Sequence, residues 1–321
     1  MSGGFIRRMD RGETTIDFVG LRRRWFIISA SFIIISLASL GIRQLNLGIE
    51  FVGGIGMQSP NPAGADIGEI RSALESVGVT SPTIQLLDDG AAVRISTEAL
   101  ETSVANDAVE AISDVTGAER SEISTEAVGP SFGALVARRA LLALGVFLGA
   151  VILFISWRLE FKMAITAIVA VLHDLLMTIG VYSLTGFVVT PATVVAILTI
   201  LGYSLYDGVV VFDKIEELVE IEDDKTYSEI VNLALNQVLA RSLFTSLSSL
   251  LPVGSILLVG SVILGAPTLT EFALALFVGL AVGTYSSIFV AAPLLAVWKE
   301  KEPFWQERAQ KLERRKRAGR K

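Results

Sequence analysis

The sequence predicts a polytopic α-helical membrane protein, with six transmembrane helices and one extracytoplasmic α+β domain between the first and second helices. Of the 321 residues, 52% are hydrophobic, and the mean hydropathy is +0.60. Such values are too high for an ordinary soluble protein of this length. The apolar residues also gather in six long stretches, and one large polar segment separates the first stretch from the second.

Each apolar stretch has about 18–27 residues, which is enough to cross a hydrocarbon core of about 30 Å at about 1.5 Å per residue of helix. The first stretch has no convincing small-residue cleavage site, so we expect it to remain as an anchor helix, 25–45. The other five stretches belong to the segment 136–298. The six stretches are Trp25–Ile42, Ala140–Trp157, Met163–Leu184, Pro191–Phe212, Leu243–Leu264 and Phe272–Trp298.

Basic side chains predict the orientation of these helices. Lysine and arginine are concentrated in the N-terminal segment 1–24, in the connection Arg158–Lys162 and in the tail 299–321. The short loops Thr185–Thr190 and Gly265–Glu271 contain neither residue. Because positively charged flanks and short loops stay in the cytoplasm, we expect both termini, including the basic tail, on the cytoplasmic side.

The polar segment 46–135 is then extracytoplasmic, and we expect it to form a small folded domain. Its helical part has apolar residues at helical spacing, and a turn at Asp88-Asp89-Gly90 joins two strands. The order of the elements, βαββαβ, is the ferredoxin-like arrangement. The expected elements are a strand at Glu50–Gln58, a helix at Asp66–Val77, strands at Thr83–Leu87 and Ala91–Ser96, a helix at Glu98–Val115 and a last strand at Glu122–Val128.

A second polar segment, 213–239, is expected to be a charged, helix-prone cytoplasmic loop between the fourth and fifth helices. Its acidic clusters, Glu216-Glu217 and Glu220–Asp224, favour a solvated face over a metal site. The chain has no cysteine and a single histidine, which excludes disulfides and thiolate metal sites and disfavours a histidine-rich metal centre.

Asp207 lies inside the fourth apolar stretch, about six residues from its cytoplasmic end, with Tyr203 and Ser204 one turn earlier. An ionised side chain at membrane depth costs about 2.5–3.5 kcal/mol. A hydrogen bond within the membrane averages well under about 1 kcal/mol, so a purely structural role would be a net cost. We therefore expect Asp207 to bind and release protons. The alternative is a buried acid that stabilises a contact between helices.

Arg241 begins a polar stripe in the fifth helix, and Thr245 follows it at helical spacing. This stripe is expected to face other helices rather than lipid. Arg241 enters from the cytoplasmic side at a depth similar to that of Asp207, so the two side chains are expected to be able to approach each other. A guanidinium favours an ionised carboxyl and burial disfavours it, and a proton carrier needs this balance to change. The alternative is an Arg241 that snorkels to the head groups.

His173 and Asp174 lie near the middle of the third helix, and His173 is the only histidine of the chain. Adjacent residues on a helix diverge by about 100°, so both line one interior face only loosely. For this pair, a proton relay and a polar brace between helices are both open. The same two roles are open for Asp213, Tyr203, Ser204 and Thr245.

Short motifs in a fixed order resemble those of the SecF family, the smaller subunits of the SecD–SecF protein-export complex, in the resistance–nodulation–division superfamily. Any one motif would be weak, but the whole series, in a six-span plan with one large external loop, is highly specific. The motifs are Glu50–Gly54, Val128–Pro130, Leu172–Asp174, Gly202–Asp207 with Val209–Lys214, Ala234–Thr245 and Gly283–Leu295.

The resemblance implies a role in protein export without enzymatic activity. Such proteins act with SecD and the SecYEG channel, and use the proton-motive force to help draw an unfolded polypeptide across the bacterial plasma membrane late in translocation. YajC is a further candidate partner. No nucleic acid is implied, and no cofactor besides the coupling proton. In the family, the acid and the arginine that match Asp207 and Arg241 serve proton translocation.

This chain departs from the family pattern beside the acid. The family usually has Asn before it and Thr or Ser after it, where this chain has Tyr206 and Gly208. The hydrogen-bond neighbours of Asp207 are therefore expected to differ from those in other members. Glu216 also replaces the basic residue that usually follows Asp213-Lys214-Ile215.

Two other functions stay open at this point. A proton-driven exporter of small molecules from the same superfamily would have two fused halves and two large external loops, whereas this chain has one of each. An intramembrane aspartyl protease would use two acids close together. The second Gly-x-Gly-Asp element of such a protease is absent from the sequence, and Asp174 lies in an unrelated context.

Overall fold

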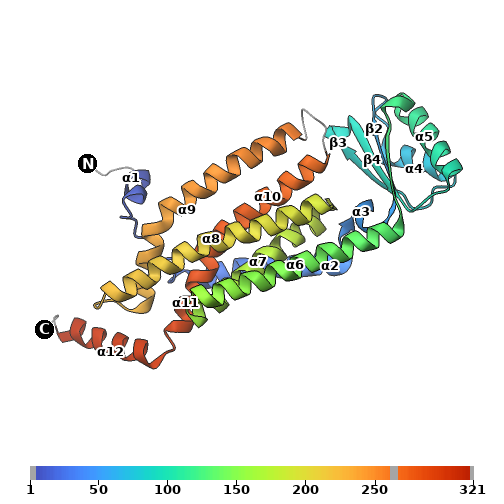
Figure 1. The fold of residues 1–321 in the computed structure, drawn as a ribbon. Helices are drawn as coiled ribbons and strands as arrows, with labels where there is room; N and C mark the ends of the chain where they lie inside the picture. The colour runs from blue at the N-terminus through green and yellow to red at the C-terminus, as the bar shows by residue number, and fades with distance from the viewer. Residues whose placement is uncertain (1–4, 261–266, 319–321) are drawn as a thin grey trace.

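The computed structural model describes residues 5–260 and 267–318. Within them, six helical segments are long and apolar enough to cross a membrane, as the sequence predicted. They form one bundle, with a β-sheet at one end and the helices α1 (Phe5–Asp10) and α12 (Pro303–Ala318) at the other (Figure 1). The six segments are α2 (Arg22–Arg43), α6 (Pro130–Arg158), α7 (Phe161–Thr185), α8 (Pro191–Ile221), α9 (Tyr227–Leu258), and α10 (Pro267–Ser286) continued by the π-helical turn η4 (Ser287–Ala291) and α11 (Ala292–Lys299).

Three helices extend well beyond their apolar stretches. α6 begins at Pro130, inside the segment 46–135 that was expected to belong to the α+β domain. α8 continues to Ile221 and α9 begins at Tyr227, so the helix-prone segment 213–239, expected to be a loop, is mostly helical. Only 222–226 connects the two helices. Charged residues at the end of a helix lower the local hydropathy without breaking the helix. Hydropathy therefore predicted helices that are shorter than those in the structure.

The start of α9 is fixed by a capping box. The Thr226 side chain accepts a hydrogen bond from the Glu229 amide, and the Glu229 carboxylate accepts one of 2.8 Å from the Thr226 amide. This pair sets the helix start well before the expected start of the span at Leu243. The expected end of that span, at 261–264, lies outside the described residues.

Between α2 and α6 the chain folds into a four-stranded antiparallel sheet with two helices. The strands lie in the order β3-β4-β2-β5, so β2 and β4 are central. The helices share one apolar core with the strands, in which Ile70, Leu74, Val93 and Ile112 are fully buried. The elements are β2 (Gly54–Pro60), α4 (Ile67–Ser76), β3 (Thr83–Leu87), β4 (Ala92–Thr97), α5 (Thr102–Thr116) and β5 (Ser124–Val128).

A short helix, α3 (Ile49–Val52), stands where the sequence predicted the start of a strand at Glu50–Gln58. The prediction was wrong here because Gly53, which ends the helix, has a φ of 79°, a left-handed value that a strand does not allow. A Cβ atom at Gly53 would lie 2.6 Å from the Cα of Pro130, the first residue of α6. Glycine therefore lets the sheet region join the bundle at close range.

The sheet region is fastened to the helices at several further points. β1 (Asn46–Leu47) pairs in parallel with β6 (Val188–Val189), in the connection between α7 and α8. The Gln85 side chain of β3 donates to the Gly186 carbonyl at 3.1 Å. On the other side, Arg94 of β4 forms a largely buried ion pair with Glu271 of α10. These contacts place the sheet directly on the ends of α7, α8 and α10.

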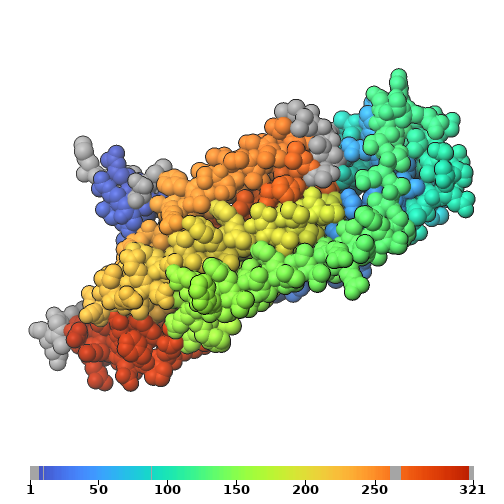
Figure 2. Space-filling view, in the orientation of Figure 1, coloured from blue at the N-terminus to red at the C-terminus, as the bar shows by residue number. Residues whose placement is uncertain are grey.

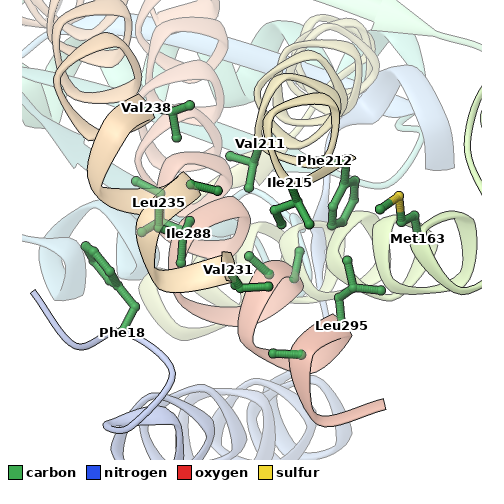
Figure 3. Packing of buried hydrophobic residues seen from close by; sticks show 14 of the residues in the cluster. Phe18, Met163, Val211, Phe212, Ile215, Val231, Leu235, Val238, Ile288 and Leu295 are labelled. Atoms are coloured by element: carbon green, nitrogen blue, oxygen red, sulfur yellow. The ribbon is translucent and has the colours of Figure 1, made fainter. Parts of the chain in front are cut away.

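At the opposite end, a large apolar core fills the space between α8, α9 and α11 (Figure 3). Phe212, Leu235 and Leu295 are fully buried there, and Phe18 from the N-terminal segment closes the core. Asn236 of α9 holds this segment, because its side chain bonds both backbone groups of Ile16 at 2.9 Å. The space-filling view shows the resulting elongated molecule, with the sheet region and α12 at opposite ends (Figure 2).

Candidate functional site within the membrane

Asp207 is buried in the bundle, in the otherwise apolar middle of α8. The residue is 8% exposed, and its Oδ1 accepts a hydrogen bond of 2.8 Å from the hydroxyl of Ser242 on α9. Its other oxygen, Oδ2, is buried and has no hydrogen-bond partner among the described residues. Buried polar atoms are nearly always paired, so this unpartnered oxygen requires an explanation.

Ser287, the first residue of η4, supplies that explanation. Its side chain lies beside the carboxyl of Asp207, and its hydroxyl donates to the Gly283 carbonyl at 2.9 Å. A serine hydroxyl has one proton, so it serves either the Gly283 carbonyl or the Asp207 carboxylate, and the hydroxyl can turn from one to the other. An ionised carboxylate is an acceptor only. The arrangement therefore suits both states of Asp207: a protonated carboxyl can donate to Ser287 while Ser287 donates to Gly283, and a carboxylate can accept from Ser287 once its hydroxyl turns.

Two glycines bring α10 close enough to α8 for these contacts. A Cβ atom at Gly283 would lie 2.9 Å from the Cβ of Ser204, and one at Gly279 would overlap the side chain of Ile200. The spacing Gly-xxx-Gly is a common pattern where membrane helices pack closely. A larger residue at either position would push η4 away from Asp207.

Arg241 does not reach Asp207 in this structure. Its Nη2 donates to the Tyr206 hydroxyl at 3.2 Å, and among the described residues no ion pair joins it to Asp207. In this conformation Ser242 faces the acid, because neighbouring residues point about 100° apart on a helix, and Arg241 acts on the carboxyl through its charge and not through an ion pair. Tyr206 is 57% exposed, so the Arg241–Tyr206 pair lies on the outer face of α8 and α9.

A second buried carboxyl, Asp174 of α7, lies where three helices meet. Its Oδ1 is 3.0 Å from Nδ1 of His173. Its Oδ2 accepts hydrogen bonds from Ser204 of α8 and from Ser286 of α10, the latter at 2.8 Å. His173 and Asp174 are 4% and 1% exposed. The structure thus brings together three of the residues that the sequence analysis offered as relays or braces.

The other three candidates of that group lie apart from both buried carboxyls, and none of them is buried. Asp213 forms an ion pair of 2.7 Å with Arg158 near the sheet-distal end, Thr245 donates to the Arg241 backbone carbonyl at 2.6 Å, and Tyr203 accepts a hydrogen bond of 3.4 Å from Ser249.

Sequence reasoning missed the three serines that lie against the buried acids, Ser242, Ser286 and Ser287. Serine is common in membrane helices and often bonds the backbone of its own helix, so its presence alone marks no site. A usable signal was nonetheless present in the sequence. Ser242 directly follows Arg241, and two consecutive serines interrupt the apolar stretch of the sixth span.

Comparison with known proteins identifies the family. A family model described as "Protein export membrane protein SecD/SecF, C-terminal" matches residues 108–301, which contain both buried acids. A protein of Streptomyces coelicolor named Protein translocase subunit SecF is 40% identical over 92% of this chain and 80% of its own length. The chain belongs to the SecD/SecF family of protein export membrane proteins. A second SecF, from Desulfurispirillum indicum, is 35% identical over 93% of this chain and 97% of its own length.

A solved structure of the SecD/SecF family shows the same architecture. The crystal structure of SecDF from Thermus thermophilus, described as a translocon-associated membrane protein, matches with a TM-score of 0.82 and 30% identity. The match covers 92% of this chain and 41% of that one, so this chain spans about two-fifths of the longer protein. Family membership favours a role in protein export over the alternatives of a small-molecule exporter and an aspartyl protease.

Proposed function

We propose that this chain is an accessory subunit of protein export that, with SecD, couples proton movement to late polypeptide translocation through the SecYEG channel. Membership of the SecD/SecF family supports the export role, and the likeness to a SecDF protein supports SecD as the partner. SecYEG, YajC and the unfolded polypeptide are inferred from the family resemblance alone. The coupling step rests on one observation, the buried Asp207 carboxyl, whose Oδ2 has no hydrogen-bond partner among the described residues and beside which Ser287 lies.

The proposed cycle begins when a proton from outside the cytoplasm neutralises Asp207, whose Oδ2–H then donates to Ser287. Loss of the proton leaves a carboxylate that keeps this contact only if the Ser287 hydroxyl leaves the Gly283 carbonyl and donates to Asp207, so the hydrogen bonds between α8 and η4 must change. One charge crossing about 100 mV supplies about 2.3 kcal/mol. That free energy biases two conformations by about fifty-fold.

Arg241 is proposed to stabilise the ionised state after such a change. Arg241 directly precedes Ser242 on α9. A rotation of α9 would therefore bring the guanidinium towards Asp207 and away from Tyr206. The present position of Arg241 also points to a partner. A charged side chain that faces lipid is costly, so we infer that SecD covers the outer face of α8 and α9 around Arg241 and Tyr206.

The sheet region is inferred to be a ferredoxin-like domain outside the cytoplasm. Its order of helices and strands and its antiparallel sheet support that fold. The basic helix α12 lies at the far end of the bundle, which supports a cytoplasmic location for both termini (Figure 1).

Helix α10 is the proposed connection between the proton site and this domain. Arg94 of β4 holds Glu271 near one end of α10, and Ser286 at the other end bonds to Asp174. These two points are about 22 Å apart along the helix. A shift of α10 at the buried acids would therefore move the attachment of the sheet.

The deciding experiment compares Asp207→Asn with Asp213→Asn, an acid of the same helix that lies at the surface. Each variant would be reconstituted with SecD and SecYEG in vesicles that carry an imposed pH gradient. Asparagine can donate to Ser287 as a protonated acid does, but it cannot exchange the proton. We expect Asp207→Asn to assemble normally and to lose the gradient-dependent stimulation of translocation, while Asp213→Asn keeps it. Normal stimulation by Asp207→Asn would overturn the coupling proposal.

A further inference from the structure

His173 presents a buried nitrogen that the cycle above does not use. Its Nε2 is buried and has no hydrogen-bond partner among the residues that the structure describes. The ring stacks on Tyr285 of α10, with the ring centroids 6.2 Å apart. An unpartnered polar atom so deep in a membrane protein is unusual and is a candidate for binding a proton.

The other ring nitrogen indicates which tautomer is present. Nδ1 lies 3.0 Å from Oδ1 of Asp174, so a proton on Nδ1 is donated to the carboxylate. A proton on Nε2 would instead be a buried donor without an acceptor, which is unfavourable. Asp174 then accepts from His173, Ser204 and Ser286, and the Ser286 hydroxyl also lies 3.1 Å from the Gly283 carbonyl. These donors fit an ionised carboxylate, because it is an acceptor only.

We propose that His173 and Asp174 form a second proton-binding site, in which Nε2 of His173 takes up the proton. The inference rests on the proposed proton-coupled function and adds a named site to it. Binding forms one N–H bond at Nε2 and breaks no covalent bond. The charge of the pair changes from negative to neutral, because the imidazolium is balanced by the Asp174 carboxylate. An isolated cation would be costly at this depth, and the carboxylate removes that cost.

Hydroxyl groups on two helices connect this pair to Asp207. On α8, Ser204 bonds to Asp174 and lies about one turn before Asp207. On α10, Ser286 bonds to Asp174, and Ser287, the next residue, lies beside Asp207. The two sites therefore share the helices α8 and α10 with its continuation η4, so a shift of either helix on proton uptake at one site would move a serine that lies against the other.

The surroundings of the pair contain few other titratable groups. Tyr285 faces it from α10, and Asp207 is the nearest acid along α8. The charges that the structure describes on the remaining neighbours lie near the two ends of α7. Among them are Lys299 of α11 paired with Glu160, Lys162 of α7 paired with Glu302, Arg158 of α6 paired with Asp213, Arg22–Arg24 and Arg43 of α2, and Glu271 of α10 paired with Arg94.

The single histidine makes a direct test possible, because ¹⁵N-labelled imidazole reports on His173 alone. The full chain would be reconstituted in phosphatidylcholine–phosphatidylglycerol vesicles, and the two ring-nitrogen NMR signals would be followed from about pH 8 to about pH 4. We expect a bare Nε2 at high pH and protons on both nitrogens at low pH. In Asp174→Asn, the ratio of doubly to singly protonated rings at a given pH should fall at least about tenfold, because the counter-charge is lost.

Thr178→Val is the matched control. The Thr178 hydroxyl donates to the backbone carbonyl of Asp174 at 2.8 Å and leaves the carboxylate untouched, so the ratio should not change. If Asp174→Asn fails to fold, Ser286→Ala replaces it. Without the Ser286 hydroxyl, the Asp174 carboxylate interacts more strongly with the imidazolium. The ratio of doubly to singly protonated His173 rings should therefore rise.

An Nε2 that stays bare over the whole range would overturn the second site, and so would a titration that neither Asp174→Asn nor Ser286→Ala alters. The measurement needs no SecD, channel or polypeptide, so its result is separate from the export assay. Should Asp207→Asn stimulate export normally while His173 titrates as expected, the coupling proposal fails and the second proton site remains.

Discussion

Ser242 donates a hydrogen bond of 2.8 Å to Asp207, whereas Arg241, one residue earlier, bonds to Tyr206 on the outer face of the bundle. A neutral hydroxyl, and not a guanidinium, therefore faces the buried acid. A hydroxyl stabilises a carboxylate without cancelling its charge. Because no ion pair to Asp207 is present among the described residues, a proton is the direct way to neutralise this carboxylate, which suits a group that must alternate between two states.

The first prediction concerns Ser242→Ala. Hydrogen bonds to charged groups contribute about 1.5–3 kcal/mol, so the ratio of ionised to protonated Asp207 at a given pH should fall about tenfold or more. Infrared spectroscopy of the carboxyl band in the reconstituted chain would measure this ratio. Ser246→Ala is the control, because Ser246 lies one turn further along α9 and bonds to Thr284 and the Ser242 carbonyl. Equal ratios in both variants would contradict the role of Ser242.

The second prediction concerns the face that SecD covers. The chain has no cysteine, so a single introduced thiol is unique. Tyr206→Cys should cross-link to cysteines in the membrane helices of co-expressed SecD, because Tyr206 is exposed beside Arg241. Leu141 of α6 is 71% exposed, against 57% for Tyr206, and Leu141→Cys should nevertheless react far less. A higher yield from Leu141→Cys would place SecD on a different face of the bundle.

The third prediction concerns the ion pair between Arg94 and Glu271. Removal of one partner of a buried pair costs about 3–5 kcal/mol, because the remaining charge is left uncompensated. Arg94→Ala should therefore loosen the sheet from α10, and amide hydrogen exchange in β4 and at the start of α10 should increase. Arg120→Ala breaks an exposed pair with Glu110 and should change little.

A second variant separates charge from packing at this contact. Replacing both partners, Arg94→Met with Glu271→Met, removes the charges but keeps side chains of similar length. Protection in β4 should then recover at least in part, because no unpaired charge is buried. Equal exchange in the single and double variants would show that packing, and not charge, holds the sheet there.

The fourth prediction concerns pH and the helix α12. A hydrogen bond from Lys162 holds the pKa of Glu302 below its ordinary value, and the two groups form an ion pair of 2.8 Å. Because the pKa is lowered in the folded state, this pair stabilises the fold above the ordinary carboxyl pKa and is lost as the pH falls through the lowered one. α12 begins at the next residue, so its resistance to proteolysis should decline in acid.

Glu302→Gln removes the ion pair with Lys162 at every pH. The resistance of α12 to proteolysis should therefore be lower already at neutral pH and should not decline further in acid. Glu313→Gln provides the control, since Glu313 pairs with Arg317 at a fully solvated position on α12. An acid response that is identical in Glu302→Gln and in the unmodified chain would assign the effect to another group.

The six spans and the burial of Asp207 could be predicted from the sequence, because a long apolar stretch has few alternatives to crossing the membrane. The partner of Asp207 could not. Arg241 and Ser242 differ by about 100° around α9, and the packed rotation of that helix decides which of them faces α8. Hydropathy carries no information on that rotation.

The sheet region shows the same division between what the sequence predicts and what it does not. Periodicity placed two helices and three of the four strands nearly where the structure has them, because half-buried elements repeat their apolar residues. The helix α3 was missed because its end depends on Gly53, whose left-handed backbone serves a contact with Pro130 far along the chain. Such a contact between distant segments leaves no local pattern.

The π-helical turn η4 has a consequence for the end of the bundle that lies away from the sheet. A π turn holds one residue more than an α turn, so rewinding it would swivel everything downstream by about 100°. The helices α11 and α12 follow η4 in the chain, and Lys299 of α11 forms an ion pair of 2.5 Å with Glu160. Rewinding of η4 beside Asp207 would therefore shift α11 and α12 at one end of the bundle, while a movement of α10 would shift the sheet at the other end.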